Sequence, residues 1–260
     1  MIVDVHVHPM LRFGNAACFD EEEAKLLDCM DRAGIEKSNA IPIATNERGF
    51  TAYTNTDVIE YMASFLYKIL ERNPRRFYSM IWLNPYLPMD VLSDFIRRYV
   101  LNGPFNGIKI LYEMKVSDRK FEPLAAFMEK YDVPVLIHAW YNNFQAYAEC
   151  EPCDIACLAG KFPGLRILMA HLRGSRFRGV QDIKKHKNVS IDTCGSESED
   201  GYLAYALKEL GPERVVYGSD YPGRDFSASI GRIESLDMPD EVREKIFSQN
   251  AINFLTGGRL

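Results

Sequence analysis

The strongest constraint on the fold of this chain is a regular alternation between short apolar segments and segments with helical spacing of their apolar residues. Eight apolar segments are predicted to be strands, at residues 2–8, 38–44, 77–83, 107–111, 133–137, 165–170, 189–193 and 214–218. Helical patterns follow them, at residues 20–33, 57–72, 90–101, 118–130, 152–162, 180–187, 201–210 and 240–254. Strands that are apolar on both faces indicate a parallel sheet covered by helices. The sequence therefore predicts the α/β class and a single (β/α)8 TIM barrel, with residues 1–260 as one domain.

Composition excludes several classes of partner. The formal net charge is -5, so there is no basic surplus to neutralise a nucleic-acid backbone. No apolar run approaches the length of a membrane span. The N-terminus lacks the pattern of a signal peptide, and the six cysteines are expected to be free thiols. We therefore expect a cytoplasmic protein that binds neither nucleic acid nor membrane.

Histidines gather at the predicted strand ends. The first strand carries His6 and His8 on one side of its pleat, while His138 and His171 end the fifth and sixth strands. Asp220 follows the eighth strand, so four of the five histidines and this aspartate fall where barrel enzymes hold their chemistry. For any single one of these histidines, a core imidazole bonded to a backbone carbonyl is the alternative.

Short motifs carry a resemblance to a known family. They are VDVHVH at residues 3–8, LIH at 136–138, MAH at 169–171, YGSDYP at 217–222 and KIFSQNA at 245–251. In their order and placement they resemble the amidohydrolase superfamily, and within it the "amidohydrolase 2" branch. That branch holds decarboxylases, hydratases and lactonases as well as hydrolases, so the motifs do not specify a substrate.

The resemblance implies a divalent metal held by His6, His8, His138 and Asp220. Three imidazoles and a carboxylate suit zinc, which is the expected ion, with manganese and iron as alternatives. Asp220 would also accept a proton from an activated water. His171 would orient that water, polarise the substrate or donate a proton.

Lys109 ends the fourth predicted strand and bears on the number of ions. Some superfamily members carry a carboxylated lysine at this place that bridges two metals, and His138 and His171 would then bind the second ion. A lysine that binds substrate or pairs with an acid is the preferred interpretation, and it goes with one ion.

Other residues that follow strand ends are candidates for the substrate pocket. Arg48 and Arg173 could pair with a carboxylate, and Trp140 could form an apolar wall. Pairing with nearby loop acids and packing of the barrel top are the respective alternatives.

The leading hypothesis is a metal-dependent hydrolase that attacks an ester, lactone or amide of a small, carboxylate-bearing substrate. The first alternative is a non-oxidative metal-dependent decarboxylase or hydratase of a small unsaturated or aromatic acid. The second is a barrel that retains its metal but only binds a ligand. The resemblance also allows a homodimer.

Overall fold

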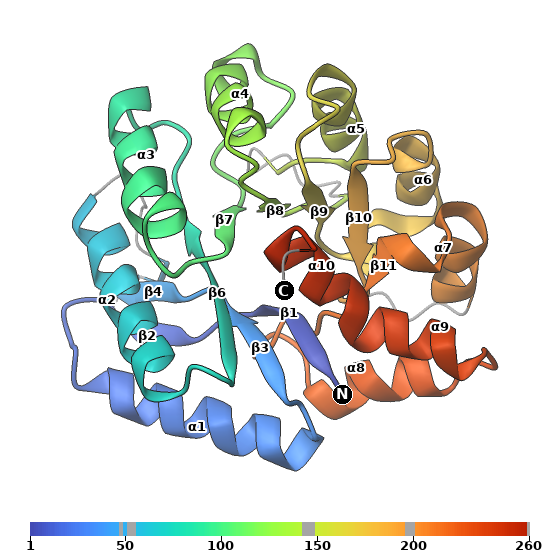
Figure 1. Cartoon of the computed structure of the whole chain (residues 1–260), viewed down its shortest axis with the longest axis horizontal. Coiled ribbons are helices and arrows are strands. Elements are labelled where there is room, and N and C mark those ends of the chain that lie inside the picture. The colour runs from blue at the N-terminus through green and yellow to red at the C-terminus, as the bar shows by residue number, and fades with distance from the viewer. Residues whose placement is uncertain (47–48, 51–55, 142–148, 196–200, 259–260) are drawn as a thin grey trace.

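The computed structural model describes residues 1–46, 49–50, 56–141, 149–195 and 201–258. Eight parallel strands form one sheet in the order β1-β3-β6-β7-β8-β9-β10-β11, with helices around it (Figure 1). These strands are β1 (Val3–Val7), β3 (Lys37–Ala40), β6 (Phe77–Trp82), β7 (Gly107–Ile110), β8 (Val135–Ile137), β9 (Ile167–Met169), β10 (Val189–Asp192) and β11 (Val215–Val216). The predicted (β/α)8 barrel is confirmed.

The last strand returns to the first and brings the two ends of the sheet together. The amide of Val5 donates to the carbonyl of Tyr217 over 3.0 Å, and Val7 forms a parallel bridge with Tyr221. The amide of His8 then donates to the carbonyl of Tyr221 over 2.7 Å. This junction places the loop after β11 directly beside the end of β1.

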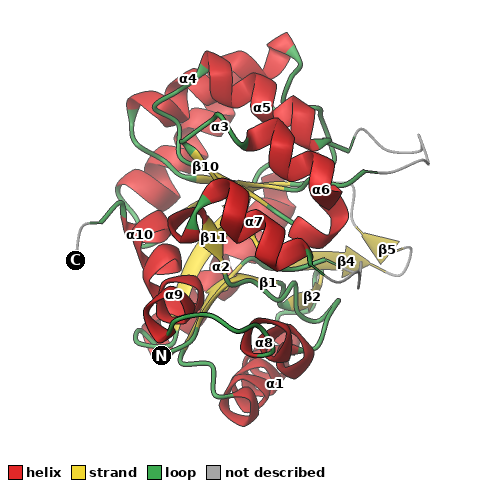
Figure 2. Ribbon diagram, turned by 90° about the vertical axis from the view of Figure 1, so that its right-hand side faces the viewer, coloured by secondary structure: helices red, strands yellow, loops and turns green. Residues whose placement is uncertain are grey.

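The α-helices cover the outside of the strands (Figure 2). They are α1 (Cys18–Ala33), α2 (Thr56–Arg72), α3 (Met89–Ile96), α4 (Glu122–Lys130), α5 (Pro152–Lys161), α6 (Leu172–Ile183), α7 (Tyr202–Leu210), α8 (Phe226–Glu234), α9 (Asp240–Glu244) and α10 (Asn250–Thr256). Single π-helical turns extend α3 (Arg97–Leu101) and join α9 to α10 (Lys245–Gln249). No helix in the described part of the chain has the length and apolar character that a membrane span requires.

The structure differs from the sequence prediction at several elements, among them α8, which was not predicted. The apolar segment 38–44 divides at Pro42, which has no N–H to donate to a sheet, and β4 (Ile43–Asn46) leaves the barrel. It pairs with β2 (Met10–Arg12) and β5 (Gly49–Phe50) in a small separate sheet at the periphery of Figure 2. The helix predicted at 180–187 instead begins just after His171, as α6.

The C-terminal helix closes one end of the barrel. Leu136, Leu168 and Val216 form a buried cluster with Phe254 and Leu255 of α10. Figure 1 shows α10 lying across the ring of strands. The opposite end, where the strands finish, is left for the polar residues described next.

Candidate metal centre at the barrel mouth

Buried polar side chains converge where four strands end. His6 lies on β1, Lys109 on β7 and Asp192 on β10, and none of the three exposes any surface. His8 follows β1 and is nearly as enclosed, whereas Asp220 follows β11 and its side chain is 23% exposed. A buried polar side chain is stable only when its polar atoms have hydrogen-bond partners. The contacts among these residues therefore determine what the site can bind.

His6 and His8 turn the same nitrogen toward each other. The Nδ1 atom of His6 lies 2.8 Å from Asp192 Oδ2, and His8 Nδ1 lies 2.8 Å from the carbonyl oxygen of Ile41. Because both partners are acceptors, each Nδ1 carries the ring hydrogen and each Nε2 keeps a lone pair. The two Nε2 atoms are 2.9 Å apart. Two lone pairs facing at this distance repel one another, and a cation between them removes that repulsion.

Asp220 completes a group of three. Its Oδ1 lies 3.7 Å from His6 Nε2 and 3.5 Å from His8 Nε2, and the donor atoms of the three residues lie within 4.8 Å of one another. Burial raises the pKa of Asp220 to about 7, and the charge of Lys109 opposes that rise. Its backbone is left-handed, with φ of 64°. Its amide donates to the His6 carbonyl over 2.9 Å, which helps to hold this unfavourable conformation beside β1.

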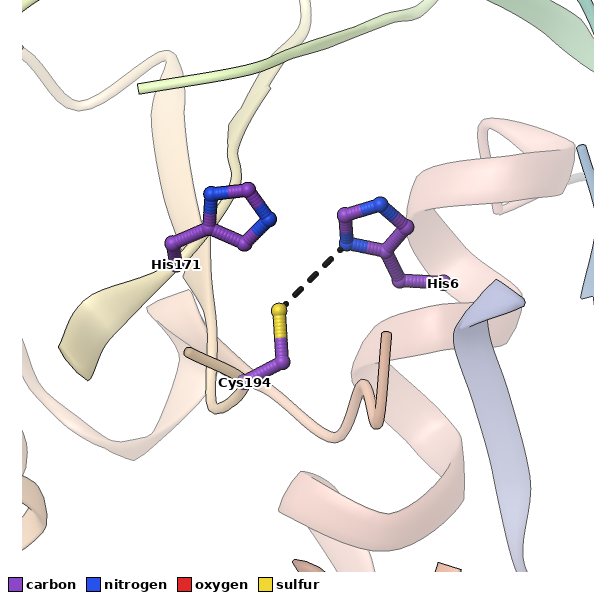
Figure 3. Close-up of side chains that lie close together, drawn as sticks. All are labelled: His6, His171 and Cys194. Atoms are coloured by element: carbon purple, nitrogen blue, oxygen red, sulfur yellow. Dashed lines mark hydrogen bonds between the residues drawn. The ribbon is translucent and has the colours of Figure 1, made fainter. Parts of the chain in front are cut away.

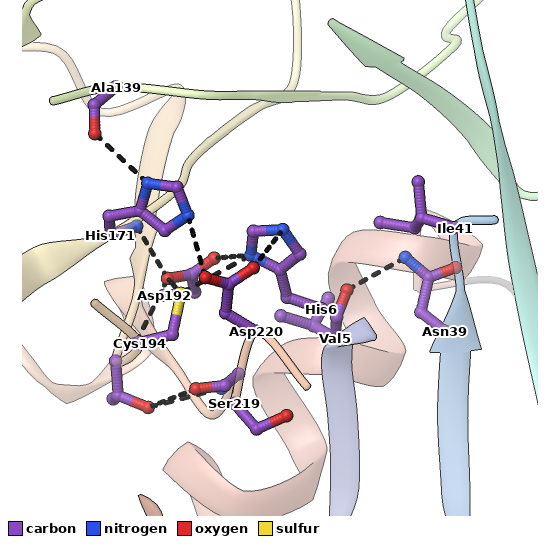
Figure 4. Close-up of polar contacts among 12 residues, drawn as sticks. Val5, His6, Asn39, Ile41, Ala139, His171, Asp192, Cys194, Ser219 and Asp220 are labelled. Carbon is purple, nitrogen blue, oxygen red and sulfur yellow. Dashed lines mark hydrogen bonds and ion pairs between the residues drawn. The ribbon is translucent and has the colours of Figure 1, made fainter. Parts of the chain in front are cut away.

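His171 faces Asp220 from the other side (Figure 4). Its Nε2 lies 3.7 Å from Asp220 Oδ2, and its Nδ1 donates to the carbonyl of Ala139 over 3.3 Å. Among the described residues, the buried Nε2 atom has no hydrogen-bond partner. His171 also has a left-handed backbone, with φ of 72°. The ring therefore presents a free lone pair to the carboxyl of Asp220.

His138 is oriented differently from the other three histidines. Its ring lies 4.7 Å from that of His171, but its Nε2 is 3.6 Å from Glu149 Oε1. It is not a member of either candidate metal group among the described residues. The sequence analysis missed Glu149, because it lies in the long connection after β8 with no periodic pattern around it.

Lys109 is the cationic member of the site. Its Nζ lies 3.0 Å from His6 Nε2, the same atom that faces His8 and Asp220. Burial lowers the pKa of Lys109 to about 8, while Asp192 and Asp220 act in the opposite direction. The lysine thus occupies the centre of the mouth rather than its rim.

Asp192 was also absent from the sequence prediction. It ends β10 as the histidines end their strands, so a search for acids as well as histidines at strand ends would have found it. Beside it, the Sγ atom of Cys194 lies 3.4 Å from His6 Nδ1, and Cys194, His6 and His171 form a second close group (Figure 3).

The predicted substrate-binding residues are described only in part. Trp140 lies with its ring 5.4 Å from that of His171, as a wall beside the site. Arg48 and the side chain of Arg173 lie outside the described residues.

The donors fit a divalent cation. Burial lowers the pKa of His8 to about 3, and it lowers the pKa values of His6, His138 and His171 as well. Neutral imidazoles with outward-bonded Nδ1 atoms and a carboxylate form the donor set that first-row divalent ions prefer.

Comparisons with known proteins agree with this architecture. A family model described as "Amidohydrolase" matches residues 3–256. A search of curated proteins found no match. Among solved structures, 5-carboxyvanillate decarboxylase from Sphingomonas paucimobilis has a TM-score of 0.75 at 16% identity, with 98% of each chain covered.

Two further solved structures resemble the chain over nearly its whole length. For 2,6-dihydroxybenzoate decarboxylase from Rhizobium, the TM-score is 0.76 at 15% identity, with 99% of each chain covered. For a dihydroxybenzoic acid decarboxylase from a Polaromonas species, with bound manganese and the inhibitor 2-nitroresorcinol, it is 0.73 at 16% identity. That comparison covers 100% of this chain and 98% of the other. At these identities the likeness establishes a shared fold.

Proposed function

The chain belongs to the amidohydrolase family of enzymes, and from that premise we propose that it is a metal-dependent, non-oxidative decarboxylase of a small aromatic acid. The observation that carries the proposal is the pairing of the Asp220 carboxyl with three imidazole nitrogens. The resemblance to several aromatic-acid decarboxylases over 98% or more of the chain supports this choice over hydrolysis, the leading hypothesis from the sequence.

His6, His8 and Asp220 would hold the divalent ion, with His138 as the proposed fourth ligand. Manganese is bound in the Polaromonas relative, and zinc is the ion expected from the sequence. The bound ion would supply a positive charge that binds substrate oxygens. The Nζ atom of Lys109 lies 3.0 Å from His6 Nε2, the nitrogen that would bind the ion. Its positive charge would therefore favour a negatively charged substrate.

Decarboxylation needs a proton at a defined point. When the bond between the ring carbon and the carboxylate breaks, carbon dioxide leaves and its bonding electron pair stays on the ring carbon. A proton must then form the new C–H bond. Asp220 would deliver this proton, because its carboxyl lies half-buried at the mouth and its pKa is raised to about 7.

His171 and Trp140 would serve the same step. The Nε2 of His171, which has no hydrogen-bond partner among the described residues, lies 3.7 Å from Asp220 Oδ2. It would take up a proton from water and pass that proton to Asp220 after each turnover. The indole of Trp140 would pack against an aromatic substrate and exclude water from the carbon that takes the proton.

The test is a substrate screen that compares the two reactions. Metal-loaded protein is incubated with 2,6-dihydroxybenzoate and 5-carboxyvanillate, with release of carbon dioxide as the readout, and with a panel of lactones in parallel. We expect carbon dioxide from an aromatic acid, and lactone hydrolysis alone would contradict the proposal.

A matched pair of variants then tests the residue roles. Asp220→Asn should abolish turnover while leaving much of the metal bound. His186→Asn changes a histidine that follows α6 away from the mouth and should retain activity. Full activity in Asp220→Asn would exclude Asp220 as the proton donor.

A further inference from the structure

The side chain of Asp192 contacts both His6, a proposed metal ligand, and His171, the proposed proton-transfer residue. Its Oδ2 lies 2.8 Å from the ring nitrogen Nδ1 of His6. Its Oδ1 accepts from the amide of His171 over 2.8 Å and from the amide of Cys194 over 3.2 Å. The thiol of Cys194 donates to the same Oδ1 over 2.8 Å. In each of these contacts the fully buried carboxylate is the acceptor (Figure 4).

The contact with His6 favours a lone pair on Nε2 of that ring, and Lys109 Nζ, a donor 3.0 Å from Nε2, favours the same tautomer. A neutral imidazole carries one hydrogen, and an acceptor beside Nδ1 draws it to Nδ1. The lone pair is then left on Nε2, the atom 2.9 Å from His8 Nε2. With the hydrogen on Nε2 instead, the ring would turn an N–H group toward the candidate metal position and could not bind a cation there.

The contact with His171 acts on the backbone. The amide of His171 points at Asp192 Oδ1 while its residue is held at φ of 72° and ψ of 65°. This left-handed conformation is unfavourable for a residue with a β-carbon, so it persists only where neighbouring bonds hold it. It directs the ring of His171 toward Asp220 and lets α6 begin at the next residue.

We propose that Asp192 is a positioning residue that sets the ring tautomer of His6 and the backbone of His171 together. The metal ligand and the proton-transfer residue are thereby oriented by the two oxygens of one carboxylate. This inference rests on the proposed function for its consequence in catalysis, but the tautomer itself is a property of the metal-free protein.

The variant Asp192→Asn separates the two oxygens. Backbone amides of His171 and Cys194 can only donate, so the oxygen of the substituted carboxamide has to stay at the Oδ1 position. The NH2 group of that carboxamide then faces His6 Nδ1, which must become an acceptor. The ring hydrogen moves to Nε2, where the lone pair of His8 Nε2, 2.9 Å away, can accept it. Affinity for a divalent ion then falls about 10- to 100-fold, the usual effect of losing such a partner.

Asp4 provides a matched control. It is another fully buried aspartate in contact with His6, but its Oδ1 accepts from the backbone amide of His6 over 2.9 Å and from that of Ser219 over 3.1 Å. Asp4→Asn leaves the ring of His6 untouched, because its amide oxygen can keep both of these bonds. A general loss of structure would affect both variants, whereas a change of tautomer should affect only Asp192→Asn.

The experiment is heteronuclear NMR on metal-free protein with 15N-labelled histidine, with Mn2+ binding measured by calorimetry alongside. We expect His6 to carry its hydrogen on Nδ1 in the wild type and in Asp4→Asn, and on Nε2 in Asp192→Asn. Mn2+ affinity should fall about 10- to 100-fold in Asp192→Asn. Asp192→Ala removes the acceptor without adding a donor and should give a mixture of both tautomers. This variant replaces Asp192→Asn in the test if Asp192→Asn does not fold.

Three results would overturn the inference. They are an Nε2 hydrogen on His6 in the wild type, an unchanged tautomer in both Asp192 variants, and the same change in Asp4→Asn. The expected tautomers in a protein that decarboxylates no aromatic acid would support the inference and count against the proposed function alone.

Discussion

Replacing Gly174 by alanine should show that this glycine makes room for the indole beside the site. Gly174 lies in the first turn of α6, and a β-carbon built there would lie 2.3 Å from Cε3 and 2.6 Å from Cδ2 of Trp140. The backbone on both sides is tied, since the Trp140 amide donates to Cys150 and the Tyr141 amide donates to Gly174 itself. The indole must therefore move by roughly 1 Å or more from its place beside the ring of His171.

The magnitude follows from two opposing effects. Overpacking of this kind costs about 1–3 kcal/mol, whereas alanine is better than glycine inside a helix by about 1 kcal/mol. Gly231 in α8 offers the matched control, because nothing lies within 4 Å of the β-carbon that alanine would add there. Gly231→Ala should therefore gain about 1 kcal/mol and Gly174→Ala should lose stability. The two melting temperatures should differ by about 3–10 °C for a chain of this size.

Thermal melts of both variants, together with tryptophan emission, measure the effect. The chain has only two tryptophans, Trp82 and Trp140, so a shifted emission in Gly174→Ala with Trp82 replaced by Phe reports the displaced indole. In a Trp140→Leu background the clash is removed, and Gly174→Ala should then raise the melting temperature. The reasoning is refuted if Gly174→Ala is as stable as Gly231→Ala, or if its cost persists in the Trp140→Leu background.

Three other predictions concern stability and metal. Arg214 is buried and donates to the carbonyls of Val189, Lys184, Ile183 and His186, so Arg214→Met should lose about 4 kcal/mol in urea unfolding, with Arg214→Lys intermediate. Equal stability of the three proteins would contradict this. Burial raises the pKa of Glu113 from 4.5 to about 7, so the folded state binds more protons than the unfolded state between those pH values, and stability falls as pH rises through that window. Glu113→Gln has no carboxyl to titrate and so lacks this loss of stability. The melting temperature of Glu113→Gln minus that of the wild type should therefore increase from pH 5 to pH 8. A difference that stays constant over this range would contradict the prediction. Chelation should lower the melting temperature of metal-loaded protein, because an ion at 100 times its Kd adds about 2.7 kcal/mol of stability. Adding Mn2+ or Zn2+ should restore the melting temperature. In His8→Ala, chelation should leave the melting temperature unchanged.

The sequence alone determined the barrel and the residues at its strand ends. Apolar periodicity is a local property, and eight such segments with helices between them leave few ways to bury both faces of every strand. Parallel strands in a barrel all finish at one end, so the positions of His6, Lys109 and His171 along the chain were enough to predict that they lie near one another.

Only the tertiary structure decided how those side chains are oriented. The hydrogen on the ring of His6 depends on Asp192, which lies 186 positions away in the chain, and the ring of His138 turns to Glu149. The start of α6 was missed because glycine has low helix propensity. In the folded protein Gly174 is needed for the close packing of Trp140, which the sequence does not show. Such contacts join residues that are distant in sequence, and their geometry exists only after the strands have closed into a barrel.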